Sequence, residues 1–261
     1  MRSLNRGFTL IELITVLVIL GIVAGIGSSF LITTVDSYRV TENRAKLISR
    51  GRVTIEQMTR QLRLALPNSL RVSASGNCLE FFPLVAGVNY IGELPDSNNG
   101  APQITTISTA PITFGLGVPL HAVVGGLSSA EIYSNSVPAA RTSIAGTSAP
   151  PPTITLSSSH RFIRNSINKR VFLADNPKRF CVSGNTLVQY QSYGLDTGVL
   201  SDGDPGGSTT IMSFDVAAVG TVFTLSPGSE QRNAAVYISL AFTANNETVD
   251  LNQTVLIRNV P

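Results

Sequence analysis

The feature that most constrains the fold of this 261-residue chain is a long apolar run near its amino terminus. From Leu13 to Val35 no residue is charged, a run of 23 positions, whereas a helix needs about 20 apolar residues to cross a bilayer. Arg2 and Arg6 precede the run, and Asp36 is the first charged residue after it. The positive-inside rule therefore predicts one membrane-spanning helix, with the amino terminus in the cytoplasm and the remainder of the chain outside.

A cleaved secretory signal is the main alternative for this segment. Such a signal has an apolar core of about 7–15 residues and a cleavage site of the A-x-A type. The run in this chain is longer, and Val23-Ala24-Gly25 is a poor substitute for that site. The sequence therefore favours a helix that stays attached to the protein as an anchor.

A single acid, Glu12, lies at the apolar start of this helix, where a charge costs at least about 2.5–3.5 kcal/mol. It belongs to the stretch Gly7–Leu13, GFTLIEL, which follows a short basic leader. This stretch resembles the class III signal of type IV pilins and pseudopilins. In that family a membrane peptidase cuts after the glycine, here Gly7, and methylates the new amine, here that of Phe8. The resemblance implies that residues 1–7 are a leader peptide.

The same resemblance suggests why the chain keeps Glu12. After the cut, the positive amine of Phe8 would lie four residues away, one helical turn along the same face. Glu12 would pair with that amine, or with the amine of a neighbouring subunit staggered along a fibre, and either pair offsets much of the cost of burying the carboxylate. The alternative is a Glu12 that is solvated at the headgroup boundary. We predict an assembly charge pair, whose loss permits insertion but impairs assembly.

Beyond the apolar run the sequence predicts an amphipathic continuation of the helix. Apolar residues recur at spacings of three, four and seven, namely Ile48, Ile55, Met58, Leu62 and Leu66. Pro67 ends the pattern, because the residue before a proline disfavours helical geometry. One helix over residues 8–66 would be about 90 Å long. We expect residues 8–35 to lie in the membrane or fibre and residues 36–66 to pack on the head.

Residues 67–261 predict a large head built of antiparallel β-strands, outside the cytoplasm. One strand is expected at residues 78–85, and a hairpin at Arg179–Tyr190 with its turn at Ser183–Asn185. Together with the long helix, this head predicts an α+β fold.

A second hairpin is expected near the end of the chain. Apolar and polar residues alternate over residues 236–257 on both sides of Asn245-Asn246, which is typical of a half-buried antiparallel pair. Residues 92–152 are instead rich in Gly, Pro, Ser and Thr. They are interpreted as long loops with short strands rather than as a second core, and no domain boundary is evident.

The two cysteines, Cys78 and Cys181, would face an oxidising compartment. An even pair flanked by strand patterns favours one disulfide, and two free buried thiols are the alternative. The net charge of +3 comes partly from the leader, so the rest of the chain offers no argument for a nucleic-acid partner.

Little in the sequence points to catalysis or to a bound metal. Asp196, Asp202 and Asp204 form a weak calcium candidate, for which a plain exposed turn is the alternative. His121 and His160 have no metal-ligand spacing with the cysteines, and no G-x-S-x-G motif is present. We therefore expect no enzymatic activity and no cofactor.

Further segments narrow the resemblance. Residues 58–72, Cys78–Phe81 and the ending at 255–261 are similar to minor pilins of the MSHA (mannose-sensitive haemagglutinin) pilus, specifically of the MshO type. The plan of a long helix followed by a large β head is also similar to J-type minor pseudopilins of type II secretion. The resemblance implies a low-abundance structural subunit that helps to initiate or cap a pilus.

This interpretation implies particular partners and a location. The partners would be other pilin or pseudopilin subunits, the prepilin peptidase, the inner-membrane assembly platform and the lipid bilayer. The chain would be a single-pass inner-membrane protein with a periplasmic head, or would reach the pilus tip at the cell surface. The alternative, from a different class of function, is an uncleaved, signal-anchored binding protein or adhesin.

Overall fold

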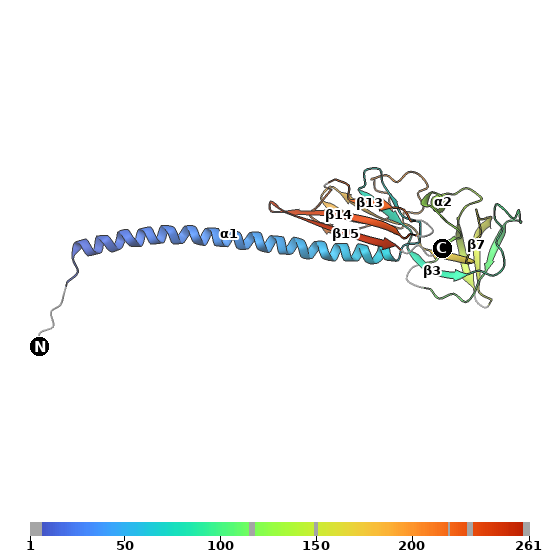
Figure 1. Cartoon of the computed structure of the whole chain (residues 1–261), viewed down its shortest axis with the longest axis horizontal. Helices are drawn as coiled ribbons and strands as arrows, with labels where there is room; N and C mark the ends of the chain where they lie inside the picture. Colours follow the sequence, from blue (N-terminus) through green and yellow to red (C-terminus); the bar gives the residue numbers. More distant parts are fainter. Residues whose placement is uncertain (1–6, 115–117, 149–150, 219, 229–231, 258–261) are drawn as a thin grey trace.

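A long helix and a β-rich head make up the computed structural model (Figure 1). The structure describes residues 7–114, 118–148, 151–218, 220–228 and 232–257. The predicted basic leader, except for its last residue, and the end of the chain at 258–261 lie outside the described residues. Helix α1, Leu10–Arg63, has 54 residues and projects from the head as a rod.

Helix α1 ends at Arg63, before the predicted end at Leu66. The backbone after it pairs with the chain that leads into the next strands. The Leu66 N–H donates to the Phe82 carbonyl at 2.8 Å, and the Leu64 carbonyl accepts from the Leu84 N–H at 2.8 Å. These bonds replace the last helical turn, so the predicted boundary is wrong by one turn.

Two antiparallel sheets pack with the second half of α1. The first has the order β1-β2-β9-β10-β11 and comprises β1 (Arg71–Val72), β2 (Cys78–Phe81), β9 (Lys178–Ser183), β10 (Thr186–Gln191) and β11 (Ser208–Phe214). In the second, β14 pairs with β12, β13 and β15; its members are β12 (Val216–Ala217), β13 (Phe223–Ser226), β14 (Ala234–Ala244) and β15 (Glu247–Ile257). Helix α1 contacts β11 from the first sheet and β14 and β15 from the second.

The buried face of α1 follows the predicted stripe with one exception. Ile55, Met58 and Leu62 are buried in the core with both sheets, as the spacing predicts. Leu47 is buried, however, whereas its neighbour Ile48 is only half-buried. The first buried residue of the apolar face is therefore Leu47, one residue before the predicted Ile48.

Gly51 lets α1 approach the second sheet closely. A Cβ atom at this position would lie 2.2 Å from Leu251 Cδ1 and 2.9 Å from Phe242 Cε2. Glycine is the residue that lets a backbone come this near to its neighbours. The glycine therefore sets the depth at which the helix sits on β14 and β15.

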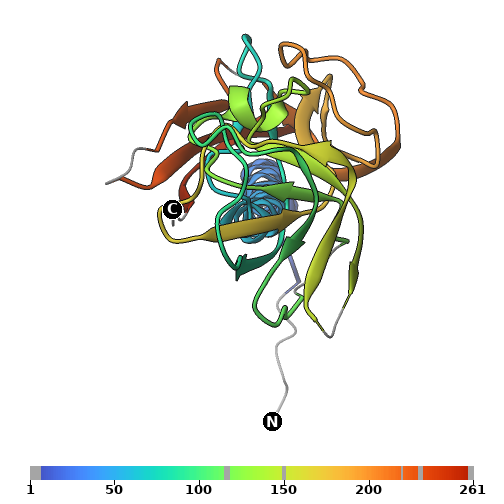
Figure 2. The same cartoon turned by 90° about the vertical axis from the view of Figure 1, so that its right-hand side faces the viewer.

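A third sheet lies at the end of the head farthest from the amino terminus (Figures 1 and 2). Its order is β3-β8-β5-β6-β7-β4, and a short helix, α2 (Ser129–Tyr133), follows β5. The members are β3 (Leu84–Asn89), β4 (Ile104–Ser108), β5 (His121–Val123), β6 (Arg141–Ser148), β7 (Thr153–His160) and β8 (Arg170–Ala174). Figure 2 shows α1 end-on behind these strands.

This third sheet has its own hydrophobic core, so the prediction that residues 92–152 contain no second core is wrong. The core gathers buried side chains from every strand of the sheet, among them Val88, Ile107, Ala122, Ile144, Ile154 and Leu173. Strands β4 and β6 each place only one buried residue in this core, Ile107 and Ile144, and most of their other residues are Thr, Ser or Gly. The apolar pattern of these two strands is therefore weak until the sheet is assembled.

Both predicted hairpins are confirmed, whereas the single strand predicted at 78–85 is wrong, because Phe82 and Pro83 separate β2 in the first sheet from β3 in the third. Strands β9 and β10 pair in register around the turn, with Ser183 opposite Thr186. Strands β14 and β15 pair over their full length, and the turn residues Asn245 and Asn246 have φ of 52° and 63°. Positive φ at both central residues is what a two-residue hairpin turn requires.

Candidate processing and assembly site

The peptide bond between Gly7 and Phe8 lies outside any helix or strand. Residues 7–9 have no regular secondary structure, and the Phe8 side chain is 80% exposed. Helix α1 begins at Leu10 rather than at the predicted Phe8, because Thr9 has extended backbone angles and caps the helix. A peptidase can therefore reach this bond without unwinding α1.

Thr9 and Glu12 form a capping box at the start of α1. The Glu12 N–H donates to Thr9 Oγ1 at 3.4 Å, and the Thr9 N–H donates to Glu12 Oε2 at 3.3 Å. The box satisfies two amides that a helix start leaves free. The sequence analysis missed this local role, although Thr followed by Glu three residues later is its signature.

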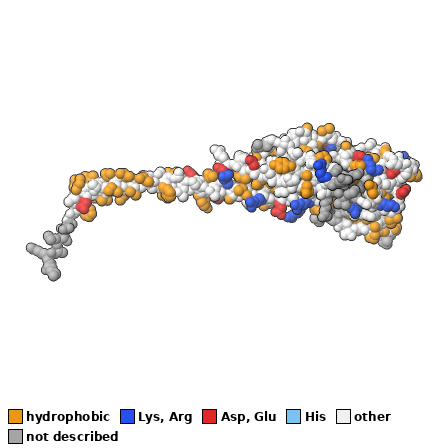
Figure 3. All heavy atoms as spheres, in the orientation of Figure 1, with side chains coloured by type: hydrophobic (Ala, Val, Ile, Leu, Met, Phe, Trp, Pro, Cys, Tyr) orange, Lys and Arg blue, Asp and Glu red, His pale blue; other side chains and the backbone are white. Residues whose placement is uncertain are grey.

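The first half of α1 makes no packing contact with the head. Residues 10–42 are all exposed, and the most apolar 18-residue window of the helix has a mean hydropathy of 2.6 with no part buried. Figure 3 shows hydrophobic side chains along this part of the rod. By length and composition this helix fits a single-pass membrane anchor. A surface so apolar requires lipid or other protein around it.

The Ser and Thr hydroxyl groups in this half of α1 are satisfied by the helix itself. Each donates to a backbone carbonyl three or four residues earlier, namely those of Thr15, Ser28, Ser29, Thr33, Thr34, Ser37 and Thr41. Such back-bonding uses the hydroxyl donor of each of these residues within the helix. The segment is therefore compatible with a hydrocarbon environment, where unpaired polar groups are costly.

Ion pairs join the second half of α1 to the end of the head nearest the amino terminus. Arg44 lies 3.5 Å from Glu247 at the tip of the β14–β15 hairpin, and Arg50 pairs with Asp215 between β11 and β12. Together with the buried stripe, these contacts set the direction in which the rod leaves the head.

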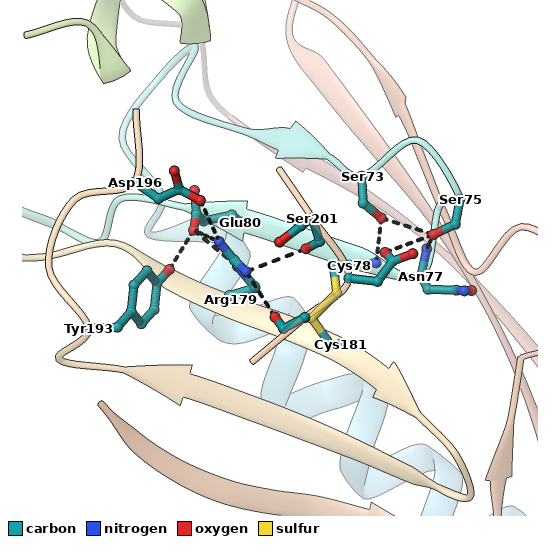
Figure 4. Close-up of a disulfide and its surroundings, with 12 residues drawn as sticks. Ser73, Ser75, Asn77, Cys78, Glu80, Arg179, Cys181, Tyr193, Asp196 and Ser201 are labelled. Carbon is teal, nitrogen blue, oxygen red and sulfur yellow. Dashed lines mark hydrogen bonds and ion pairs between the residues drawn. A yellow bond between two sulfur atoms is a disulfide. The ribbon is translucent and has the colours of Figure 1, made fainter. Parts of the chain in front are cut away.

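Cys78 and Cys181 form the predicted disulfide, which joins β2 to β9 (Figure 4). Two residues along, Glu80 lies opposite Arg179 in the same pair of strands. Arg179 Nη2 is 3.0 Å from Glu80 Oε1, and the two side chains are only 1% and 0% exposed. The disulfide and a fully buried ion pair therefore hold the two strands side by side. Sequence reasoning missed this pair; its signal was a charge two residues from each cysteine.

The loop at residues 192–207 covers this pair and the disulfide. The Tyr193 hydroxyl donates to Glu80 Oε1 at 2.7 Å. Burial, followed by the charge of Glu80, raises the pKa of Tyr193, so the phenol keeps its proton. Leu200 packs with the two cysteines. Arg71 and Arg179 donate to four backbone carbonyls of the loop, those of Asp196, Gly198, Ser201 and Gly203.

The structure does not gather the three carboxylates of the calcium candidate. Asp196 Oδ2 lies 3.3 Å from Arg179 Nη2, Asp202 accepts from a serine hydroxyl at 2.8 Å, and Asp204 accepts from an N–H in its own turn at 2.8 Å. The guanidinium of Arg179 already occupies the space between Glu80, Asp196 and the loop carbonyls. Among the described residues, no group of three or more His, Cys, Asp or Glu side chains could hold a metal.

The two histidines are buried in the third sheet. His121 Nδ1 lies 3.1 Å from Arg141 Nη1, and its Nε2 lies 3.0 Å from Asn176 Oδ1. Burial, followed by the charge of Arg141, lowers the pKa of His121 to about 4. His160 Nε2 bonds the Ala139 carbonyl at 3.1 Å. Both rings serve as hydrogen-bonding groups that hold loops of the sheet.

The amino-terminal segment matches a known family. Residues 2–28 match the model of the prokaryotic N-terminal methylation motif. No curated protein and no solved structure matches the chain. The motif, the long apolar helix and the antiparallel β-rich head support a type IV pilin-like protein with the corresponding α+β fold. Proteins with this motif are structural pilins rather than enzymes, and they assemble with other pilin subunits after contact with a prepilin peptidase.

Proposed function

We propose that the chain is a minor pilin, cut after Gly7, methylated on Phe8 and packed through α1 into a pilus of the MSHA type. The observation that carries the proposal is the start of α1, where an exposed Gly7–Phe8 bond outside any helix or strand precedes an apolar half-helix, residues 10–42, that packs on no other described residue of the chain. The methylation motif spans this junction. A J-type minor pseudopilin of type II secretion shares this start, and the resemblance of residues 58–72 favours the pilus.

The proposal places the amino terminus in the cytoplasm and the head in the periplasm, or at the pilus tip at the cell surface. The head carries three sheets around two main cores, and its bulk suits a tip position better than a closely packed shaft. The subunit would thus act in initiation or tip assembly, with other pilins, the assembly platform and the bilayer as its partners.

Glu12 changes its role on cleavage in this proposal. In the uncut chain its carboxylate accepts from the Thr9 N–H at 3.3 Å and caps α1. The cut creates a positive amine on Phe8, which competes for the same carboxylate. A charged pair is stronger than a bond to a neutral amide, so we expect Glu12 to bind this amine or that of an adjacent subunit.

The first test is the mass of the amino-terminal peptide from membrane-extracted protein. A peptide that begins at methylated Phe8 would support the proposal. A start at Met1 would favour an uncut anchor or adhesin, and a start beyond Ala24 would identify a secreted protein, so either result would refute the proposal.

A second test separates charge from capping at Glu12. Glu12→Gln keeps a side chain that can close the capping box but removes the charge, whereas Thr9→Ala removes the cap and keeps the charge. We expect Glu12→Gln and Glu12→Ala to insert normally but to be scarce in sheared pili, and Thr9→Ala to be incorporated. Normal incorporation of Glu12→Gln would show that the charge has no part in assembly.

A further inference from the structure

We propose that the groove between α1 and β15 binds an extended, acidic peptide segment of a partner protein, which adds to β15 as one more strand. This contact lies on the head and does not depend on cleavage at Gly7; only the exclusion of a second copy as the occupant uses the proposed membrane anchor. Among the described residues, two features of the groove carry the proposal: an open strand edge and two arginines without an ion pair.

The backbone of β15 is open along its outer edge except at the Thr254 carbonyl, which accepts from Gln253 Nε2 at 2.9 Å. Within the described part of the chain, β15 pairs with β14 alone. The two-residue turn makes Ala244 and Glu247 the first hydrogen-bonded pair, and the bonds alternate from there. This alternation agrees with the Ser239 and Thr243 amides of β14, which donate to the carbonyls of Val222 and Asp215 on the side away from β15. The amides that face outward on β15 are therefore those of Thr248, Asp250, Asn252, Thr254 and Leu256.

Positive charge borders the groove next to this edge. A hollow of about 330 Å³ lies between α1 and β15, and Arg52 and Arg63 line it from the helix side. Neither arginine forms an ion pair within the described residues, whereas the intervening Glu56 is held by Arg60 at 3.0 Å. Figure 3 shows basic side chains where the rod meets the head.

The spacing of the two arginines fits a strand. Eleven residues of helix separate Arg52 from Arg63, which is about 16 Å at 1.5 Å per residue. An extended chain covers that length in about five residues. Side chains of a strand alternate between its two faces, so two carboxylates that both face the helix must be an even number of residues apart. A segment with carboxylates four residues apart, together with the length of the arginine side chains, would therefore reach both arginines while its backbone pairs with β15.

Thr59 supplies an unsatisfied polar atom on the same lining. Thr59 is only 9% exposed, and among the described residues its hydroxyl oxygen has no hydrogen-bond partner. Buried hydroxyls are normally bonded, but this oxygen has almost no contact with solvent. It can therefore bond a backbone group of an added segment only once its side chain rotates toward the groove. Thr59 lies between Arg52 and Arg63 along the groove.

A second copy of this chain is a poor occupant if it pairs in antiparallel fashion through β15. Strand β15 runs beside α1 in the same direction (Figure 1). Antiparallel pairing of two β15 edges would therefore point the two α1 helices in opposite directions. Two chains anchored in one membrane cannot adopt that arrangement, which favours a segment of a different partner.

The test uses the full chain in a neutral detergent and a fluorescein-labelled peptide, Thr-Asp-Thr-Val-Thr-Asp-Thr-Val, whose two Asp side chains lie on one face of a strand. Binding is followed by fluorescence anisotropy. The same peptide with Asn at both Asp positions is the control ligand. The variants are Arg52→Glu with Arg63→Glu, and a charge-matched control, Arg39→Glu with Arg170→Glu, whose arginines neither line the groove nor pair with a residue that does. Hydrogen exchange of residues 247–257 reports whether the peptide pairs with β15.

We expect the acidic peptide to bind, and the Arg52/Arg63 variant to weaken binding by about tenfold, as two surface ion pairs would. The Arg39/Arg170 variant should retain the affinity of the native chain, and the outward amides of β15 should gain protection. Absence of binding, equal loss in both variants, or binding without protection of β15 would each overturn the proposal.

Discussion

Replacing Glu80 with Gln should destabilise the head strongly although the two side chains have the same shape. The Glu80 carboxylate is fully buried and accepts from Arg71 Nε at 2.6 Å, from Arg179 Nη2 at 3.0 Å and from Tyr193 at 2.7 Å. A glutamine has one acceptor oxygen and one NH₂ donor. Because Arg71 approaches one oxygen and Arg179 the other, the NH₂ group would face a guanidinium in either orientation.

The expected loss is about 3–5 kcal/mol in the free energy of unfolding, which is typical when one partner of a buried ion pair is removed. Arg179 makes the loss large, because its side chain is only 1% exposed and would keep its charge without a nearby carboxylate of equal burial. Arg71, at 13% exposed, has more access to water. A domain has about 5–15 kcal/mol of stability in all, so the variant should unfold at clearly lower urea concentrations.

Urea unfolding of the full chain in neutral detergent, followed by tyrosine fluorescence, measures this loss, since the chain has six tyrosines and no tryptophan. The matched control is Glu80→Leu with Arg179→Leu, which removes both charges and should recover part of the stability. A loss below about 1 kcal/mol for Glu80→Gln would place the pair in the range of solvated surface pairs and refute the reasoning.

Three further outcomes are expected from the same unfolding measurements. Gly51→Ala should lose about 1–3 kcal/mol through overpacking against Leu251 and Phe242, whereas Gly27→Ala, with nothing within 4 Å of the new Cβ, should not destabilise the head. The pKa of His121 is lowered from 6.5 to about 4 in the folded chain, so the unfolded chain binds more protons between these two pH values. The free energy of unfolding should therefore fall as the pH drops from 6.5 toward 4. His121→Gln should make this pH dependence weaker. Cys78→Ser with Cys181→Ser should lower the free energy of unfolding by on the order of 4–5 kcal/mol for a loop of this length. A pH profile that is the same with and without His121, or a stability unchanged by loss of the two cysteines, would contradict the role given to that group.

The elements that sequence reasoning predicted well are those with local signals. The apolar run and the stripe of Ile55, Met58 and Leu62 have helical spacing, and α1 follows. The β14–β15 hairpin has strict alternation around Asn245-Asn246, and its pairing is confirmed over all 11 residues of each strand. In such segments the pattern, the turn chemistry and the burial all agree, so tertiary context had little to add.

The elements that were missed depend on contacts between distant parts of the chain. Strands β6 and β7 bury Ile144, Ile154 and Leu156, but most of their other residues are Ser, Thr or Gly. Only the assembled sheet makes these three side chains neighbours of one core. Glu80 and Arg179 likewise look like surface charges until β2 pairs with β9. Their position two residues from each cysteine becomes informative once the disulfide fixes the register.

The part of the head that holds α1 and the part farthest from the amino terminus have different hydrophobic cores. Helix α1 packs against β11, β14 and β15, which belong to the first two sheets. A force along the rod therefore enters the core shared with these sheets, where the Cys78–Cys181 bridge and the Glu80–Arg179 pair join β2 to β9. The third sheet has its own core and lies farthest from the amino terminus. Substitutions on the outer loops of the third sheet can therefore change what the far end of the head contacts without altering the packing of α1 on β11, β14 and β15. Such independence of the two ends is expected of a protein anchored at one end and exposed at the other.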